Sequence, residues 1–170
     1  MNLILFDDPV IKMDLLPFTF TRPVGKIRVG ILTIDEKWEK WLGLKPSFQT
    51  SGYLQKKFPL QNGPDNLLIN GAVCPDTDLV NAIETLPEGK FLVKDHLLIA
   101  ARNPRTEMTA ANTVLYDQAL TVIDKSWNIY RENGKQLRSD FKLITEGRKS
   151  SGITDHHTAL YGEENIFVEP

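Results

Sequence analysis

Short apolar runs alternate with amphipathic segments along the first half of the chain. The run at 2–6 is apolar at nearly every position and too short for a helix, which is typical of a strand buried on both faces of a parallel sheet. The run at 66–70 has the same character. Between them, apolar side chains follow the helical period over 34–42, after Thr33 and Glu36 at capping-box spacing. This order of strand, helix and strand predicts an α/β protein built on a parallel sheet.

The rest of the chain extends this pattern and adds a hairpin. Pro9, Pro17 and Pro23 prevent a continuous helix over 7–30. The further elements that we predict are, in order, a short helix near 53–58, a helix over 76–86, a hairpin with strands at 91–93 and 97–101, strand-forming residues within 112–123, and an amphipathic helix over 126–145 that Asn133-Gly134 divides in two. The expected fold is therefore α/β, with a mainly parallel sheet and a hairpin embellishment.

The composition excludes several classes of protein. The chain has 170 residues and a formal net charge of −2, from 20 Lys and Arg against 22 Asp and Glu. A surface that follows nucleic-acid phosphates normally carries a basic excess, so we expect no nucleic-acid partner. No apolar stretch approaches the roughly 18 residues of a membrane span, so no membrane partner is expected either. With one cysteine, Cys74, the chain has neither an internal disulfide nor a cysteine-based zinc site, and we expect a cytoplasmic protein with a buried thiol.

Two polar segments follow the two apolar strands. In open parallel sheets, ligands bind outside the carboxyl ends of the strands, so the segments 7–28 and 70–76 are the first candidates for a site. The first segment gathers cations and hydroxyl groups. Arg22 can donate two hydrogen bonds to a phosphate, and Lys26 offers a point charge. The residues alone also fit a surface loop whose cations are solvated and whose aromatic side chains lie in the core.

These segments resemble the amino-terminal signature of the sugar-1-phosphate nucleotidyltransferases. That signature is a short strand, a loop of the form A-A-G-x-G-T-R-M, and then P-L-T and P-K. The matching stretches here are 4–13 (ILFDDPVIKM), 16–19 (LPFT) and 21–23 (TRP). Longer phrases resemble the branch related to the bifunctional N-acetylglucosamine-1-phosphate uridylyltransferase/glucosamine-1-phosphate acetyltransferases, namely LLPFTFTRPVGKIRVGILT, EKWEKWLG, INGAVCP, LVKDHLLIAAR and LRSDFKLIT.

The resemblance implies a Rossmann-like nucleotidyltransferase domain and a definite reaction. Such enzymes join a nucleoside triphosphate to a sugar 1-phosphate and release pyrophosphate, with Mg²⁺ assisting. The protein mainly positions the phosphates and neutralises their charge. The resemblance implies Arg22 and Lys26 as the catalytic cations. The other residues that it implies are Lys12, Thr19, Thr21, Arg28, Asn70 and Gly71 in substrate binding, and Asn70 and Asp76 as candidate Mg²⁺ ligands.

Several signature positions carry other residues. Asp8 and Val10 replace two glycines whose small size lets backbone N–H groups approach a triphosphate. Val24 stands where the P-K lysine belongs, and Ala72 stands where an aspartate binds the metal. Three functions stay open: a sugar nucleotidyltransferase, a catalytically degenerate module that binds nucleotide sugars or regulates an attached acyltransferase, and an interaction domain without a small-molecule site.

The carboxyl end predicts a division of the chain. We expect a nucleotidyltransferase-like domain at 1–145, followed at 146–170 by a linker and the start of a hexapeptide-repeat β-helix domain that is missing here. The stretch 162–170 resembles one rung of such a β-helix, which needs several stacked repeats to bury a core. The full-length protein is then expected to form a homotrimer through this second domain.

Two histidine positions are candidates for other chemistry. Asp155, His156 and His157 form a candidate metal or proton-relay cluster. Adjacent side chains in an extended segment point to opposite sides, so we favour a polar linker there. His96 is expected in the turn of the hairpin.

Overall fold

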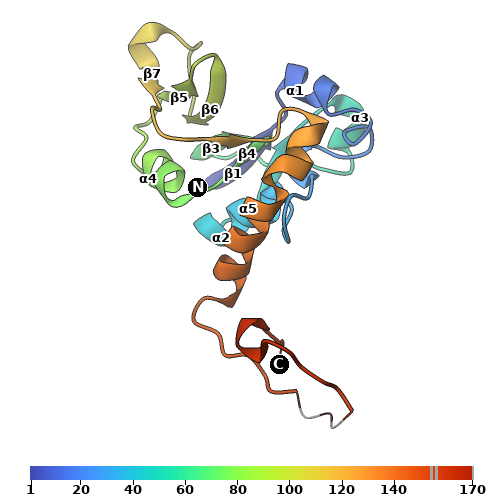
Figure 1. Ribbon diagram of the computed structural model, residues 1–170. Helices are drawn as coiled ribbons and strands as arrows, with labels where there is room; N and C mark the ends of the chain where they lie inside the picture. The colour runs from blue at the N-terminus through green and yellow to red at the C-terminus, as the bar shows by residue number, and fades with distance from the viewer. Residues whose placement is uncertain (154, 156, 170) are drawn as a thin grey trace.

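Six strands form the central sheet of the computed structural model, which describes residues 1–153, 155 and 157–169 (Figure 1). The strands are β1 (Asn2–Phe6), β2 (Ser47–Gln49), β3 (Asn66–Asn70), β5 (Phe91–Lys94), β6 (Leu97–Arg102) and β7 (Thr113–Leu115), in the order β2-β1-β3-β6-β5-β7. Strand β6 is antiparallel to both of its neighbours, and the other three pairs are parallel. A separate ladder pairs β4 (Val73–Cys74) with β8 (Thr121–Val122). The predicted α/β class, with a mainly parallel sheet and a β5–β6 hairpin, is confirmed.

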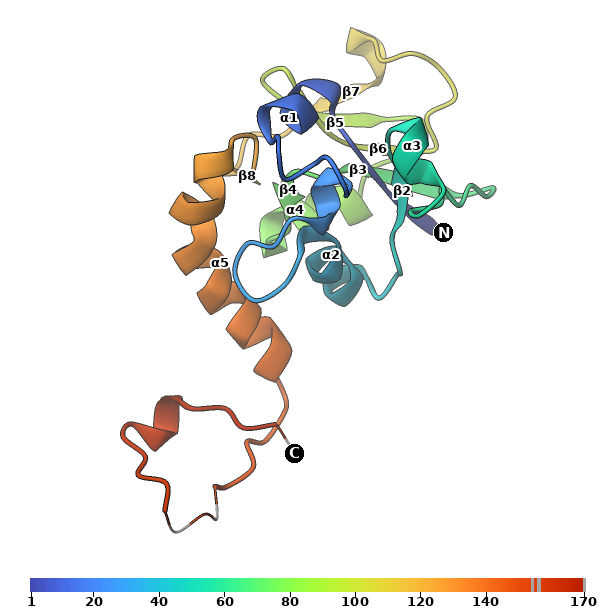
Figure 2. The ribbon, with the colours of Figure 1, turned by 90° about the vertical axis from the view of Figure 1, so that its right-hand side faces the viewer.

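Five α-helices of the described chain accompany the sheet. They are α1 (Pro9–Asp14), α2 (Ile34–Leu42), α3 (Gly52–Gln55), α4 (Thr77–Glu84) and α5 (Ser126–Thr145), with 3₁₀ turns at Val24–Lys26, Ala110–Asn112 and Glu163–Asn165. In both views α5 runs along the outside of the domain, past α2, and leads into the carboxyl-terminal segment (Figures 1 and 2).

The apolar core joins the middle of the sheet to α2 and α4. Leu5 of β1 and Ile69 of β3 are almost completely buried, as is Ile83 of α4. Trp38 of α2 is fully buried, and its indole Nε1 donates a hydrogen bond to the carbonyl of Val73 (2.9 Å). The apolar periods that predict these elements therefore correspond to side chains removed from water, which is the main source of folding free energy.

Helix α5 is continuous, so the predicted break at Asn133-Gly134 is wrong. One glycine inside a helix costs only about 1 kcal/mol relative to alanine. Asn133 is engaged with the domain, because its Oδ1 accepts a hydrogen bond from the backbone N–H of Gly30 (2.8 Å). The contact with the domain compensates for the weak helix-forming tendency of this pair.

The carboxylate of Asp140 fastens α5 to the loop before α2. It accepts hydrogen bonds from the backbone N–H groups of Ile31 (2.9 Å) and Leu32 (3.0 Å) and pairs with the ammonium group of Lys37. The side chains of Asp140 and Lys37 are only 3% and 2% exposed. At Gly30, where φ is +84°, a Cβ atom would lie 2.5 Å from Asp140 Oδ2, so glycine is needed for the loop to approach the helix. Removing either partner of such a buried ion pair leaves an unpaired charge out of solvent, which destabilises the folded protein.

Two expectations from the composition concern Cys74 and the membrane. Cys74 is buried, as expected, and burial raises the pKa of its thiol to about 12. Such a thiol is protonated at neutral pH, so Cys74 does not act as a nucleophile there. Within the described chain, no helix is both long enough and apolar enough to cross a membrane.

The segment after α5 turns back on itself and stands clear of the sheet in both views (Figures 1 and 2). Arg148 pairs with Glu169, and the N–H of Ser151 donates to the carbonyl of Val168 (3.0 Å). Of the candidate cluster in this segment, His156 lies outside the described residues, as does the last residue of the stretch that resembles a β-helix rung, Pro170.

Replacing Asp140 by alanine should destabilise the protein by about 3–5 kcal/mol, because Lys37 would remain as a buried, unpaired charge. The measurement is the free energy of unfolding in urea. Ser139→Ala, one exposed position away on α5, is the control and should change the free energy by less than about 0.5 kcal/mol. A loss for Asp140→Ala below about 1 kcal/mol, the usual value of a surface ion pair, would contradict this account of how α5 is held.

Candidate active site

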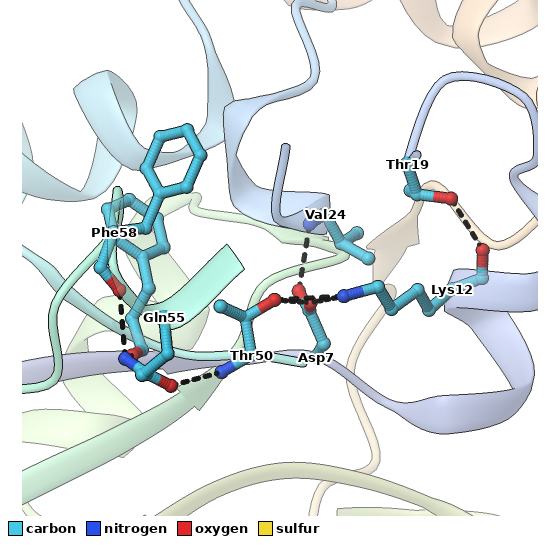
Figure 3. Close-up of polar contacts among 8 residues, drawn as sticks. Asp7, Lys12, Thr19, Val24, Thr50, Gln55 and Phe58 are labelled. Atoms are coloured by element: carbon cyan, nitrogen blue, oxygen red, sulfur yellow. Dashed lines mark hydrogen bonds and ion pairs between the residues drawn. The ribbon is translucent and has the colours of Figure 1, made fainter. Parts of the chain in front are cut away.

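Asp7 lies at the carboxyl end of β1, and its carboxylate joins three other segments (Figure 3). Its Oδ1 accepts a hydrogen bond from the backbone N–H of Val24 (2.8 Å). Its Oδ2 accepts hydrogen bonds from Lys12 Nζ on α1 (2.7 Å) and from the hydroxyl of Thr50 after β2 (2.5 Å). The side chains of Asp7 and Lys12 are 5% and 12% exposed, so the two charges are paired largely out of solvent.

Helix α1 takes the place of the phosphate-binding loop that the resemblance implies. Asp8 begins the helix, and its Oδ1 accepts hydrogen bonds from the N–H groups of Val10 (2.9 Å) and Ile11 (3.1 Å). A helix start offers such N–H groups to an anion, and here a carboxylate of the chain occupies them. Thr19 is fully buried and donates to the backbone carbonyl of Lys12 (2.7 Å), which holds the following turn against α1 (Figure 3).

The predicted catalytic cations Arg22 and Lys26 lie in different surroundings. Lys26 Nζ is 2.5 Å from Asp35 Oδ2, so its charge is already paired. Arg22 is exposed and forms neither a hydrogen bond nor an ion pair within the described residues. Arg22 and Lys26 border a shallow cavity of about 360 Å³ together with Thr21. A neighbouring cavity of about 450 Å³ brings Arg22 together with Arg28.

Asn70 and Gly71 pack the end of β3 against the rest of the domain. The amide of Asn70 is fully buried; its Nδ2 donates to the carbonyl of Leu98 (3.1 Å), and its Oδ1 accepts from the N–H of Ala72 (3.0 Å). A Cβ atom at Gly71 would lie 3.0 Å from the backbone nitrogen of Gly25, so glycine permits this close approach. The structure therefore gives both residues contacts within the protein.

The two positions expected to hold Mg²⁺ differ in how far their side-chain oxygens are already engaged. Asn70 has both ends of its amide engaged and no exposed surface. Asp76 begins α4, where its Oδ1 accepts a hydrogen bond from the N–H of Leu79 (3.0 Å). Among residues 1–153, 155 and 157–169, no group of three or more His, Cys, Asp or Glu side chains is placed to hold a metal ion. We therefore assign no chemical step to Mg²⁺.

A larger cavity, of about 590 Å³, opens at the carboxyl edge of the sheet between α1 and the β5–β6 turn. We call it the edge cleft. Its titratable lining residues are Asp8, Asp14, Lys94, Asp95, His96, Asp124 and Lys125. Lys125 pairs with Asp14 (2.5 Å), whereas Asp95 and Asp124 form no ion pair within the described chain. Asp124 Oδ1 accepts a hydrogen bond from Asn128 Nδ2 (2.6 Å), which leaves its other carboxylate oxygen for a ligand. The rest of the lining is apolar and includes Val10, Leu97 and Leu120. Carboxylates that face no cation can accept hydrogen bonds from hydroxyl groups, and apolar side chains can pack against the carbon face of a sugar ring, so the cleft combines both kinds of contact.

Sequence reasoning missed the edge cleft, although a signal was present. Ligands bind at the carboxyl ends of parallel strands. Applied only to the two apolar strands at 2–6 and 66–70, this rule gives the segments 7–28 and 70–76 as candidate sites. Strand β5 points the same way as β1 and β3 and ends at Lys94-Asp95-His96, a turn with three titratable side chains. His96 is exposed in this hairpin turn, as predicted.

A mainly parallel sheet with flanking helices and a cleft at the carboxyl ends of its strands has the architecture of a Rossmann-like domain. A family model described as sugar nucleotidyl transferase matches residues 3–149, so the chain belongs to the sugar nucleotidyl transferase family. A comparison with curated proteins found no match. The broad family expected from the signature is thus confirmed, and the finer branch stays a prediction.

Replacing Lys12 by methionine should lower the free energy of unfolding by about 3–5 kcal/mol, because Asp7 would be left as a buried carboxylate without its cation. Asp7→Asn should also destabilise the protein, since it leaves the ammonium group of Lys12 unpaired. The double variant Asp7→Asn/Lys12→Met removes both charges and should recover most of the combined loss. Urea unfolding of the four proteins measures this coupling, and losses that simply add would contradict the pairing.

Proposed function

We propose that the protein catalyses sugar nucleotidyl transfer, joining a nucleoside triphosphate to a sugar 1-phosphate and releasing pyrophosphate. The observation that supports this reaction is the edge cleft in a chain of the sugar nucleotidyl transferase family. An oxygen of the sugar phosphate forms the new bond to the α-phosphorus, and the bond between that phosphorus and the oxygen leading to the β-phosphate breaks. The protein forms no covalent bond in this step, so its contribution is positioning and charge neutralisation.

The sugar is proposed to lie in the edge cleft. Asp95 and Asp124, which face the cleft without a cation partner in the described chain, would accept hydrogen bonds from its hydroxyl groups. Hydrogen bonds to charged acceptors are stronger than those between neutral groups, so two such carboxylates can fix the orientation of a sugar.

The phosphates of the nucleotide need cations that the chain does not already neutralise. Lys12 and Lys26 are paired with Asp7 and Asp35, respectively. Arg22 is exposed and unpaired within the described residues, so we propose it as the first contact for the triphosphate. Lys12 donates two of its three N–H groups to Asp7 Oδ2 (2.7 Å) and Thr50 Oγ1 (2.9 Å), so only the third is open to a phosphate while Asp7 stays in place.

A second function, binding of a nucleotide sugar without turnover, is favoured by a specific observation. The carboxylates of Asp7 and Asp8 already occupy the ammonium group of Lys12 and the first N–H groups of α1. A triphosphate bound at the start of α1 would have to displace the carboxylate of Asp8, whereas a sugar in the edge cleft would displace neither carboxylate. The expected attachment to an acyltransferase, and a homotrimer formed through it, stay predictions under either function.

Pyrophosphate release, measured over a panel of nucleoside triphosphates and sugar 1-phosphates with and without Mg²⁺, tests the transfer reaction. Arg22→Ala should lower kcat/KM by roughly 10- to 100-fold, the effect of losing one charge-assisted contact. The matched control is Arg105→Ala, because Arg105 is an exposed arginine paired with Glu88 on another part of the surface and should leave turnover unchanged.

The other outcomes separate the remaining functions. Nucleotide sugars that raise the Tm of a protein that never releases pyrophosphate would favour the binding module. If Arg22→Ala changes neither turnover nor this increase in Tm, the proposed position of the phosphates is wrong. A protein that shows neither turnover nor stabilisation has no such site, which leaves the interaction domain.

A further inference from the structure

Helix α5 leaves four large apolar side chains exposed to solvent. Trp127, Tyr130, Leu137 and Phe141 are 60%, 87%, 45% and 42% exposed. Their spacing of three, seven and four residues places them along one side of the helix, in the pattern by which helices form apolar contacts with a partner. The side chains that α5 buries against the domain include the polar Gln136 and Asp140. We call the four exposed side chains the α5 stripe.

The α5 stripe continues into a cavity of about 450 Å³ between the helix and the segment 18–28. Tyr130 belongs to both the stripe and the cavity. Phe18 and Ile27 supply apolar walls from the domain, and Ile129 supplies one from α5. The stripe and this cavity therefore form a single apolar surface, which we call the α5 groove. Contiguous exposed apolar surface often marks a contact with another molecule.

The margins of the α5 groove are basic. Arg22 and Arg28 line the cavity on the domain side. Arg131 and Arg138 are exposed on α5 and, at 100° per residue, lie next to the stripe along one flank. A second copy of α5 would bring the same cations face to face, whereas an acidic segment would neutralise them.

An acidic and partly apolar segment is present in the chain itself. We call residues 157–169 the carboxyl arm; this stretch contains Glu163, Glu164 and Glu169 and neither lysine nor arginine. It exposes Tyr161 (90%) and Ile166 (38%). Within the described chain, its hydrogen bonds and ion pairs reach only other residues after α5, and both views show it apart from the domain (Figures 1 and 2).

We propose that the carboxyl arm of one copy packs in the α5 groove of a second copy, and that the reciprocal contact completes a symmetric dimer. Tyr161 and Ile166 cover part of the α5 stripe, while Glu163 and Glu164 face Arg131 and Arg138. A contact of this kind is self-complementary, because each copy contributes one arm and one groove. The proposal needs neither the edge cleft nor turnover, although Arg22 borders both the α5 groove and the position proposed for the phosphates. It is an alternative to the β-helix rung and the homotrimer predicted from 162–170, because the same residues cannot form both contacts.

Sedimentation velocity of the intact chain tests this dimer. We expect twice the monomer mass at high protein concentration, with dissociation on dilution and when NaCl is raised from about 0.1 M to about 1 M, where charges are screened within about 3 Å. Arg131→Glu/Arg138→Glu should raise the dissociation constant at least tenfold, and Glu163→Lys/Glu164→Lys should do the same. Lys56→Glu/Lys57→Glu, a reversal of two exposed charges next to α3, is the control and should leave the dissociation constant unchanged.

Mixing the two charge-reversed proteins gives the most direct result. Each should be monomeric alone, and together they should form a one-to-one dimer, because every arm then meets a groove of opposite charge. Unchanged Tm values for the variants show that the fold is intact. The proposal is overturned by a wild-type chain that stays monomeric at all concentrations, by a dimer that is indifferent to the reversals, or by a mixture that fails to associate. Monomers that instead bind vesicles containing anionic lipid would assign the α5 groove to a lipid surface and would also overturn it.

Discussion

The arrangement at the carboxyl edge of the sheet depends on the carboxylate of Asp7. One side chain at the end of β1 receives hydrogen bonds from α1, from the residue after β2 and from the turn at Val24. Sheet hydrogen bonds fix the strands but do not fix these connecting segments relative to one another. Asp7 does so with a charge that is buried and paired, so the segments are held together only as long as Lys12 balances it.

The pairing of cations with carboxylates near this edge of the sheet has a chemical consequence. Three groups that could attract an anion already face a carboxylate of the chain: Lys12 faces Asp7, Lys26 faces Asp35, and the start of α1 faces Asp8. Charges that hold the fold are thereby separated from charges that are free to bind a ligand. Arg22 remains available within the described chain, and the acidic edge cleft remains open to hydroxyl groups.

The sequence allowed the strands β1 and β3, the helix α2 and the β5–β6 hairpin to be predicted, because burial imposes a period on their apolar residues. It did not predict β2, which has three residues and is defined by its pairing with β1. The continuity of α5 was also missed, since it depends on the contact of Asn133 with Gly30, which lies far away in the chain.

The candidate site was harder to predict than the fold for a related reason. Residue type and spacing identified Lys12 and Lys26 as cations, but only the folded structure shows that each already has a partner. The edge cleft combines side chains from α1, the β5–β6 turn and the residues before α5. No local pattern joins these segments, so their common cleft appears only once the sheet has brought them together.

The attachment of α5 through Asp140 also bears on how the sequence can change over time. Asp140 binds the main-chain N–H groups of Ile31 and Leu32, and therefore depends on the path of the backbone and not on the identity of those side chains. Ile31 is partly exposed, so substitutions can accumulate there while the helix keeps its place. This tolerance ends at Gly30, where any side chain would collide with Asp140 and with the backbone of the helix.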